Sequence, residues 1–231
     1  MPVKPEKHRT VNRQVLADHV YEEVFASLID GELEAGANIS IDGLARELDV
    51  SPTPVREALA RLEATGMVRR VALKGYRVAP VATTEELAEL MDARLVIEPV
   101  TTERTCERLT PQIYAALEQT IEDLRRAPRG ASFVNFREYW EADQRFHRLI
   151  AEHCGNQFIF SAFTALGAQN QRFRLFSELG VTDAEFAIAE HSAVLEAFAA
   201  GDPLRARQAM CTHLEEVKRR ALVDMSGQSP E

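Results

Sequence analysis

The sequence predicts a mainly α-helical chain in two parts: three helices followed by a β-hairpin, and then an all-helical bundle. Apolar residues recur at helical spacing along most of the chain, and glycines and prolines interrupt that spacing between the predicted helices. Strand-like patterns occur only within residues 67–81. With 231 residues, of which 45% are hydrophobic and 27% charged, the chain is long enough for two modest domains with separate cores.

The first eighty residues contain three predicted helices. The first helix covers VLADHVYEEVFASLI and ends at the glycines of DGELEAG. A short second helix follows in SIDGLARELDV, and the third lies in SPTPVREALARLEATG. Ser51 is the predicted N-cap of the third helix, Pro52 falls in the first turn, where proline is tolerated, and Gly66 ends the helix.

A hairpin completes this first part. The segment MVRRVALKGYRVAPV predicts two short strands around a turn at Lys74 and Gly75. Three helices followed by a hairpin is the order of a winged helix-turn-helix, in which the third helix enters the DNA major groove and the wing contacts the backbone or minor groove. We therefore expect a winged helix-turn-helix DNA-binding domain over residues 12–80, after a flexible N-terminus at residues 1–11.

The distribution of charge supports DNA binding by one segment of an acidic chain. The net charge is −9, but residues 51–80 carry six Lys and Arg against two Glu. A charge run is often only a solvated surface, but this one coincides with the predicted third helix and wing. Thr53 and Arg56 are placed for base edges and nearby phosphates, and the other basic side chains for phosphates. The predicted DNA-binding residues are Ser51, Thr53, Arg56, Arg61, Arg69, Lys74 and Gly75.

The rest of the chain predicts an all-α bundle of about six helices over residues 81–222, followed by a disordered tail at residues 223–231. The first bundle helix opens at VATTEEL, where Thr84 is the predicted N-cap of a start that resembles a capping box. Gly155-Asn156 and Gly201-Asp202-Pro203 are typical of a helix that stops and restarts. The later helices are predicted over residues 111–126, 133–153, 156–177, 183–200 and 203–222.

One aspartate and three histidines of the bundle are candidates for a shared site. Asp143 and His147 are four residues apart and therefore share a helix face. His191 lies ten residues before Gly201 and His213 lies ten residues after Pro203, so an antiparallel helix pair would bring them side by side. A carboxylate and three imidazoles are typical ligands of a divalent metal. The alternative is that each side chain is an isolated polar residue with its own partner.

Three segments resemble a known family. LARELDVSPTPVREALARLEATGMV and KGYRV resemble the DNA-binding domain of GntR transcription regulators, and DQRFHRLIAEHCGN resembles a helix of the FCD branch of that family. The chain departs from the family where Pro52 precedes Thr-Pro in place of arginine, and at Asp42-Gly43 early in the second helix. The resemblance implies an effector domain in which one divalent metal, zinc or nickel or else manganese, is held by Asp143, His147, His191 and His213.

The resemblance also implies a ligand pocket. Arg94 and Glu98 match an Arg-x-x-x-Glu pattern whose arginine faces the ligand in the family, and a guanidinium fork suits a carboxylate. Arg145 and Arg172 are further candidates for effector binding. The alternative for Arg94 and Glu98 is a surface ion pair.

Together these features predict a bacterial, cytoplasmic homodimer that binds double-stranded operator DNA, is not an enzyme, and responds to a small carboxylic acid at its metal; a repressor is favoured over an activator. The three cysteines show no CxxC spacing, and no apolar run reaches membrane-spanning length. Two alternatives stay open from the sequence. The metal is purely structural, or the chain is a metal-dependent hydrolase, because three histidines and a carboxylate also activate water.

Overall fold

The computed structural model describes residues 13–72, 75–129, 133–170 and 183–226. The chain divides into two compact units between Pro80 and Val81, and each is described by itself below. The N-terminus predicted to be flexible lies outside the described residues. Among the described helices, none is both long and apolar enough to cross a membrane.

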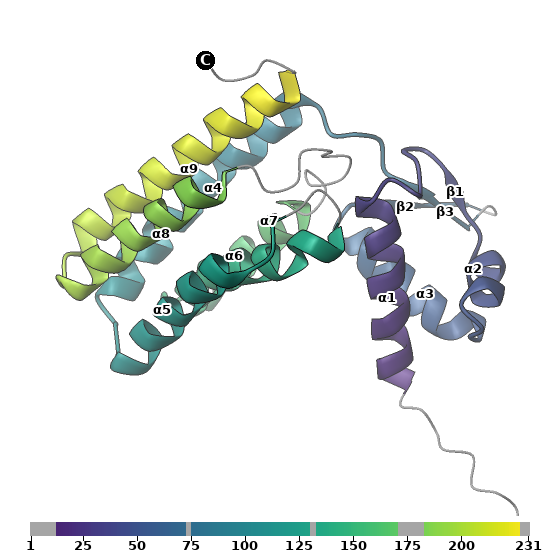
Figure 1. Cartoon of the computed structure of the whole chain (residues 1–231), viewed down its shortest axis with the longest axis horizontal. Helices are drawn as coiled ribbons and strands as arrows, with labels where there is room; N and C mark the ends of the chain where they lie inside the picture. Colours follow the sequence, from purple (N-terminus) through teal and green to yellow (C-terminus); the bar gives the residue numbers. More distant parts are fainter. Residues whose placement is uncertain (1–12, 73–74, 130–132, 171–182, 227–231) are drawn as a thin grey trace, which may run out of the picture. The chain divides into compact units, whose positions relative to one another are not determined.

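The first unit contains three helices and a small antiparallel sheet (Figure 1). Its core is formed where α1 packs on α3, and it includes Val20, Leu28, Val55, Leu59 and Leu62, which are fully buried. The apolar face of α3 is thus turned inward, as its spacing predicted. The elements are α1 (Arg13–Ile29), β1 (Asn38–Ile39), α2 (Ile41–Glu47), α3 (Pro52–Ala64), β2 (Val68–Val71) and β3 (Gly75–Val78).

The predicted wing is confirmed, with one strand more than expected. The sheet has the order β1-β3-β2, and β3 pairs antiparallel with both neighbours. The sequence did not indicate β1, because a strand of two residues is too short to show alternation. Gly75, predicted at the wing tip, is the first residue of β3 and has a φ of 88°; a Cβ there would lie 2.8 Å from the carbonyl oxygen of Ile39. Its small size therefore serves this close approach to β1 as well as the turn.

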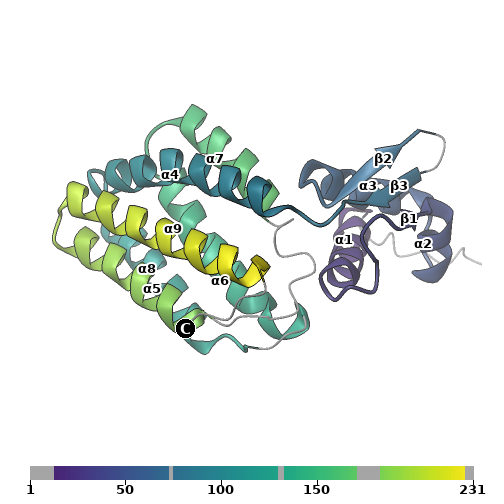
Figure 2. The same ribbon diagram turned by 90° about the horizontal axis from the view of Figure 1, so that it is seen from above.

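The second unit is the predicted bundle of six helices (Figure 1). α9 packs along both α4 and α8, while α6 packs on α4, α5 and α7 (Figure 2). α9 runs to Ser226, so the tail predicted from residue 223 is wrong for residues 223–226, and residues 227–231 lie outside the described part. Residues 171–177, predicted as the end of a helix, also lie outside it. The helices are α4 (Thr84–Cys106), α5 (Pro111–Arg126), α6 (Phe133–Glu152), α7 (Gln157–Asn170), α8 (Ala184–Ala199) and α9 (Pro203–Ser226).

The N-terminus of α4 differs by one residue from the prediction. Thr83, not Thr84, is the N-cap, because its hydroxyl accepts a hydrogen bond from the Glu86 amide at 3.1 Å. The Glu86 carboxylate in turn accepts one from the Thr83 amide at 2.9 Å. This is a complete capping box, and the sequence carries its spacing only for Thr83, which has Glu86 three residues later, whereas Thr84 has Leu87 at that position.

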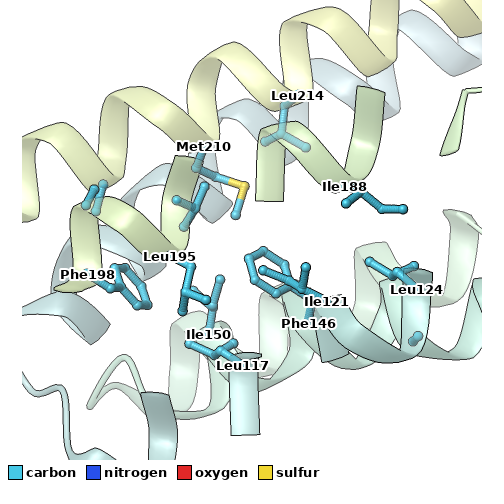
Figure 3. Close-up of a cluster of buried hydrophobic side chains, with 14 of the residues drawn as sticks. Leu117, Ile121, Leu124, Phe146, Ile150, Ile188, Leu195, Phe198, Met210 and Leu214 are labelled. Atoms are coloured by element: carbon cyan, nitrogen blue, oxygen red, sulfur yellow. The ribbon is translucent and has the colours of Figure 1, made fainter. Parts of the chain in front are cut away.

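Two of the candidate ligands, His147 and His213, are adjacent in sequence to residues of the bundle's apolar core. Phe146 of α6, Ile121 of α5 and Met210 of α9 belong to one buried apolar cluster (Figure 3). His147 follows Phe146 directly, and His213 precedes Leu214 of the same cluster. Packing of these apolar neighbours therefore fixes the helices from which the histidines project.

Candidate metal centre

Three histidines from three helices meet inside the bundle. His147 of α6, His191 of α8 and His213 of α9 are 3%, 0% and 2% exposed. Nε2 of His213 lies 3.3 Å from Nε2 of His191 and 3.3 Å from Nε2 of His147. Each side chain offers a nitrogen, and these atoms lie within 4.8 Å of one another. The structure thus brings together side chains that the sequence separates by up to 66 residues.

Asp143 lies at the edge of this histidine cluster. Its Oδ1 is 3.7 Å from Nε2 of His191 and 3.9 Å from Nε2 of His147. The Asp143 side chain is 15% exposed, which makes it the most accessible of the four predicted ligands. All four predicted ligands are therefore gathered at one place, with the carboxylate on the more open side.

The spacing of the nitrogens suits a bound ion. Neighbouring ligands of a tetrahedral ion with metal–nitrogen bonds of 2.0–2.1 Å lie about 3.3–3.4 Å apart, and both measured Nε2–Nε2 distances are 3.3 Å. The atoms that face one another are buried Nε2 nitrogens, and carboxylates near Nδ1 of His147 and His213 leave Nε2 of both rings available as a donor. The residues fit a divalent ion.

A carboxylate on α8 orients His213. Nδ1 of His213 is 2.8 Å from Oε2 of Glu190. Arg220 donates hydrogen bonds to both oxygens of this carboxylate, at 2.6 Å to Oε1 and 2.9 Å to Oε2. Although burial opposes ionisation, the hydrogen bonds from His213 and Arg220 lower the pKa of Glu190. An ionised carboxylate can only accept, so Nδ1 carries the proton and the lone pair of Nε2 faces the cluster.

A second arginine and glutamate pair stands behind His147. Oε1 of Glu98 accepts a 2.5 Å hydrogen bond from Nε of Arg94, and both side chains are buried. Oε2 of Glu98 lies 2.7 Å from Nδ1 of His147, close enough for an ion pair although not aligned for a hydrogen bond. The alternative of a surface ion pair for Arg94 and Glu98 is wrong, because the pair is buried beside the histidines.

Burial favours the neutral form of His191 and His213, which is the form that binds metals. Burial lowers the pKa of His191 well below its usual value, and the neighbouring His213 and His147 lower it further. Burial also lowers the pKa of His213, although the hydrogen bond to Glu190 opposes part of that shift. Despite its burial, the charge and hydrogen bonds of Arg94 hold the pKa of Glu98 well below its usual range. A neutral imidazole is the ligand form required by a divalent cation.

We expect acid to destabilise the metal-free protein. Because the folded-state pKa values of His191 and His213 are lowered, the folded state binds fewer protons than the unfolded state once the pH falls below the unfolded value of about 6.5. The stabilising contribution of the neutral histidines to the free energy of unfolding is complete above that pH. Below it, this contribution falls by up to about 1.4 kcal/mol per pH unit for each histidine. Chemical denaturation between pH 8 and 5 with a chelator present measures this slope.

The matched control is His19→Gln, because His19 is exposed on α1 and lies 3.9 Å from Glu23. His191→Phe is expected to flatten the dependence on pH, while His19→Gln is expected to leave it nearly unchanged. An equal slope in wild type and His191→Phe would contradict the assignment.

Two other residues, Arg145 and Arg172, were predicted to bind the effector. Arg145 is exposed and pairs with Asp123 of α5 at 3.3 Å. It follows Asp143 by two residues, which on a helix turns it to a different face, so its predicted place at the site is corrected. Arg172 lies outside the described residues.

The predicted DNA-binding residues divide into three groups. Ser51, Arg56 and Arg69 are exposed and Thr53 is half-buried, although Ser51 at the N-cap of α3 makes no capping hydrogen bond with its side chain. Arg61 instead has partners on α1, an ion pair of 2.6 Å with Asp18 and a position 4.2 Å above the Tyr21 ring. Its predicted contact with phosphate stays a prediction. Lys74 lies outside the described residues.

The sequence did not reveal Glu190 and Arg220. Glu190 is adjacent to His191, and Arg220 follows His213 by seven residues, which places it on the same face of α9. Both signals are weak, because acidic and basic residues are common on helices. Only the pairing of α8 with α9 brings them together.

Comparisons with known proteins agree with this architecture. A family model described as bacterial regulatory proteins, gntR family, matches residues 16–78, and the FCD domain matches residues 89–216. The chain is 26% identical over 228 residues to the HTH-type transcriptional regulator YcbG of Bacillus subtilis (strain 168), covering 94% of each chain. It is 23% identical over 207 residues to the HTH-type transcriptional repressor RspR of Escherichia coli (strain K12), covering 88% of each.

The fold is also similar to that of a solved structure, E. coli McbR/YncC, with a TM-score of 0.70 and 22% identity, covering 89% of this chain and 96% of that one. The relatives are transcription regulators and not enzymes, so the metal-dependent hydrolase considered from the sequence is excluded. The chain belongs to the GntR family of bacterial DNA-binding transcription regulators, with an N-terminal GntR domain and a C-terminal FCD domain.

Proposed function

We propose that the chain is a homodimeric repressor that acts in the bacterial cytoplasm, binds operator DNA through its GntR domain and senses a small carboxylic acid at a metal in its FCD domain. The observation that carries the sensing role is the convergence of three buried histidine Nε2 atoms beside Asp143. Asp143, His147, His191 and His213 would hold the ion, and zinc or nickel suits these ligands.

The charges around the site favour an anionic ligand. When bound, the divalent ion supplies positive charge and a coordination position for a carboxylate. Glu98 and Glu190 are each paired with an arginine. Among the side chains described at the site, Asp143 is therefore the carboxylate that offsets the charge of the ion without an arginine partner of its own. Nη1 of Arg94 has a weak acceptor, the sulfur of Met91, at 3.7 Å. Arg94 therefore retains a donor for the ligand even while it grips Glu98.

A purely structural metal is the alternative for the same geometry, since buried imidazoles also stabilise a bundle through an ion. Removal of the ion by a chelator separates the two roles. A sensing site loses its affinity for carboxylic acids together with the metal. If the metal is structural, its removal lowers the melting temperature of the protein, and the affinity for the acid stays the same.

The proposed contacts with DNA lie on α3 and the wing. Val55 and Leu59 of α3 face the core, and Arg56 between them is exposed. No ion pair engages Arg56 within the described ranges, in contrast to Arg61. We therefore assign base reading to Arg56 and Thr53 and phosphate contacts to Arg69 and Lys74.

Arg56→Ala is expected to weaken operator binding by about 1–3 kcal/mol, or roughly 5–150-fold, because a bidentate contact with a base edge is lost. The operator is first selected from random duplexes with the wild-type protein, and binding is then measured at several salt concentrations. The control on the same helix is Arg61→Ala, which breaks the contact with Asp18 and is expected to weaken binding much less. Equal losses for the two variants would contradict the assignment.

The homodimer is supported by the surface of α7. The helix has no charged residue, and its Phe158 is 77% exposed. α4, which packs against α7, exposes Val96 at 71%. Apolar surface of this kind is typical of an interface, and a two-fold dimer would match palindromic half-sites. Sedimentation analysis of the full chain measures the state, and a monomer at micromolar concentration would contradict the proposal.

A further inference from the structure

We propose that Arg220 is a positioning residue of the metal centre: acting through Glu190, it holds the imidazole of His213 so that Nε2 faces the other two histidines. The proposal rests on the metal site proposed above but concerns residues that lie behind it. Arg220 touches none of the predicted ligands in the contacts described. Its effect must therefore pass through Glu190.

The contacts form a ladder between two helices. Asp183 and Glu190 are seven residues apart at α8, and His213 and Arg220 are seven apart on α9, so each pair lies on one face about two turns apart. Nε of Arg220 donates to Oδ2 of Asp183 at 3.0 Å, while its Nη1 and Nη2 donate to the two oxygens of Glu190. Oε2 of Glu190 then meets Nδ1 of His213 at 2.8 Å. The order is Asp183, Arg220, Glu190, His213.

Arg220 does more than supply a positive charge, because it binds both carboxylate oxygens of Glu190. A planar guanidinium that bonds both carboxylate oxygens fixes the plane of the carboxylate as well as its position. Oε2 is thereby aimed at Nδ1 of His213, and Asp183 prevents the guanidinium from turning away. The Arg220 side chain is 13% exposed, so water competes little for these bonds. Without Arg220, the Glu190 side chain is free to rotate toward solvent.

The same arrangement recurs on the opposite side of the cluster. Arg94 grips Glu98, and Glu98 lies 2.7 Å from Nδ1 of His147. Nδ1 of His191, in contrast, has no hydrogen-bond partner among the described residues, and its ring is stacked on Phe146 with ring centres 4.1 Å apart. The imidazoles of His213 and His147 thus each face a carboxylate that is held by an arginine, whereas the imidazole of His191 stacks on an aromatic ring.

The first experiment compares Arg220→Gln with the neighbouring control Arg219→Gln in a titration of metal-free protein with Zn²⁺ against a chromophoric chelator. Arg219 is exposed and pairs with Glu216 at 2.8 Å, away from the histidines. We expect the Kd for Zn²⁺ to rise about 10–100-fold in Arg220→Gln, as is typical for loss of an outer-shell partner, and to stay within about twofold in Arg219→Gln. A counter-charge alone predicts the opposite sign, because removal of a cation near the site would tighten binding. Unchanged or tighter binding overturns the proposal.

The second experiment tests the order of the ladder. If Arg220 acts through Glu190, the double variant Arg220→Gln/Glu190→Ala binds Zn²⁺ no more weakly than Glu190→Ala alone. Additive losses would show that Arg220 acts by another route and would overturn the proposal. If Glu190→Ala does not fold, Arg220→Lys takes its place: it keeps the charge but loses the fork, and a partial rise in Kd is expected, whereas a wild-type Kd overturns the proposal.

A measurement without metal separates this inference from the proposed function. In the metal-free wild type, ¹⁵N NMR is expected to show the His213 proton on Nδ1, and in Arg220→Gln a mixture of both tautomers. If wild type binds no Zn²⁺, the metal site is wrong, but a tautomer that depends on Arg220 would still support the positioning role. If wild type binds Zn²⁺ and the tautomer does not change, the positioning role is wrong and the metal site stands.

Discussion

Replacement of His191 by alanine is expected to abolish both metal binding and the thermal shift that small carboxylic acids cause. His191 is fully buried, and its Nε2 lies 3.3 Å from Nε2 of His213 and 3.7 Å from Oδ1 of Asp143. After the substitution, Asp143, His147 and His213 remain, with a cavity in place of the fourth ligand. These donors are too few at the required spacing to hold the ion. Metal analysis of the purified protein and a thermal-shift screen of carboxylic acids, each run on wild type and variant, measure the two effects.

His153→Ala is the control in the same bundle. Its Nδ1 lies 2.8 Å from the carbonyl oxygen of Leu149, outside the histidine cluster, so metal content and thermal shift are expected to persist. Survival of the acid-induced shift in His191→Ala would show that the acid binds elsewhere. Loss of the metal with an unchanged affinity for the acid would instead indicate the purely structural metal.

Arg94→Met is expected to destabilise the FCD domain by about 3–5 kcal/mol, because it leaves the buried carboxylate of Glu98 without its main partner. Arg94 and Glu98 are both buried and joined by hydrogen bonds of 2.5 Å and 3.4 Å. Glu98 must then either remain charged without Arg94 or take up a proton, and the lowered pKa of its carboxyl in the wild type depends on Arg94. Denaturant unfolding of the metal-free protein measures the change.

Arg137→Met is the matched control, because Arg137 pairs with Glu141 at 2.9 Å with the same spacing but on an exposed surface of α6. Surface pairs contribute about 0–1 kcal/mol, so a small loss is expected. The double variant Arg94→Met/Glu98→Gln is expected to recover part of the stability, since the unpaired charge is gone. A double variant less stable than Arg94→Met would contradict this account of the pair.

The helices and their order were predictable because they depend on local chemistry. Thr110 before Pro111, the Gly201-Asp202 turn and the apolar period of α5 and α9 are all signals within a few residues of the element that they define. Two local errors have different reasons. The N-cap of α4 was assigned to Thr84 although the Thr-x-x-Glu spacing belongs to Thr83 and Glu86, whereas the two residues of β1 carry no local signal and become a strand only by pairing with β3.

The partners of charged side chains were the least predictable feature. Arg61 was expected to contact DNA phosphates and Arg145 the effector, and the structure places each beside a carboxylate on a neighbouring helix. Arg94 was expected to face the effector, and in the structure its guanidinium binds Glu98. A long arginine side chain reaches several neighbours, and which one it meets depends on how helices distant in sequence are packed.

By itself, the sequence determined the helical architecture, the winged helix-turn-helix and the four candidate ligands, because helical period, caps and residue types are local properties. The tertiary structure alone decided that Nε2 atoms from α6, α8 and α9 meet at 3.3 Å and that Glu190 and Arg220 stand behind His213. The physical reason is that these contacts join helices up to 66 residues apart. Their geometry is set by packing of the apolar core around Phe146, which no local pattern specifies.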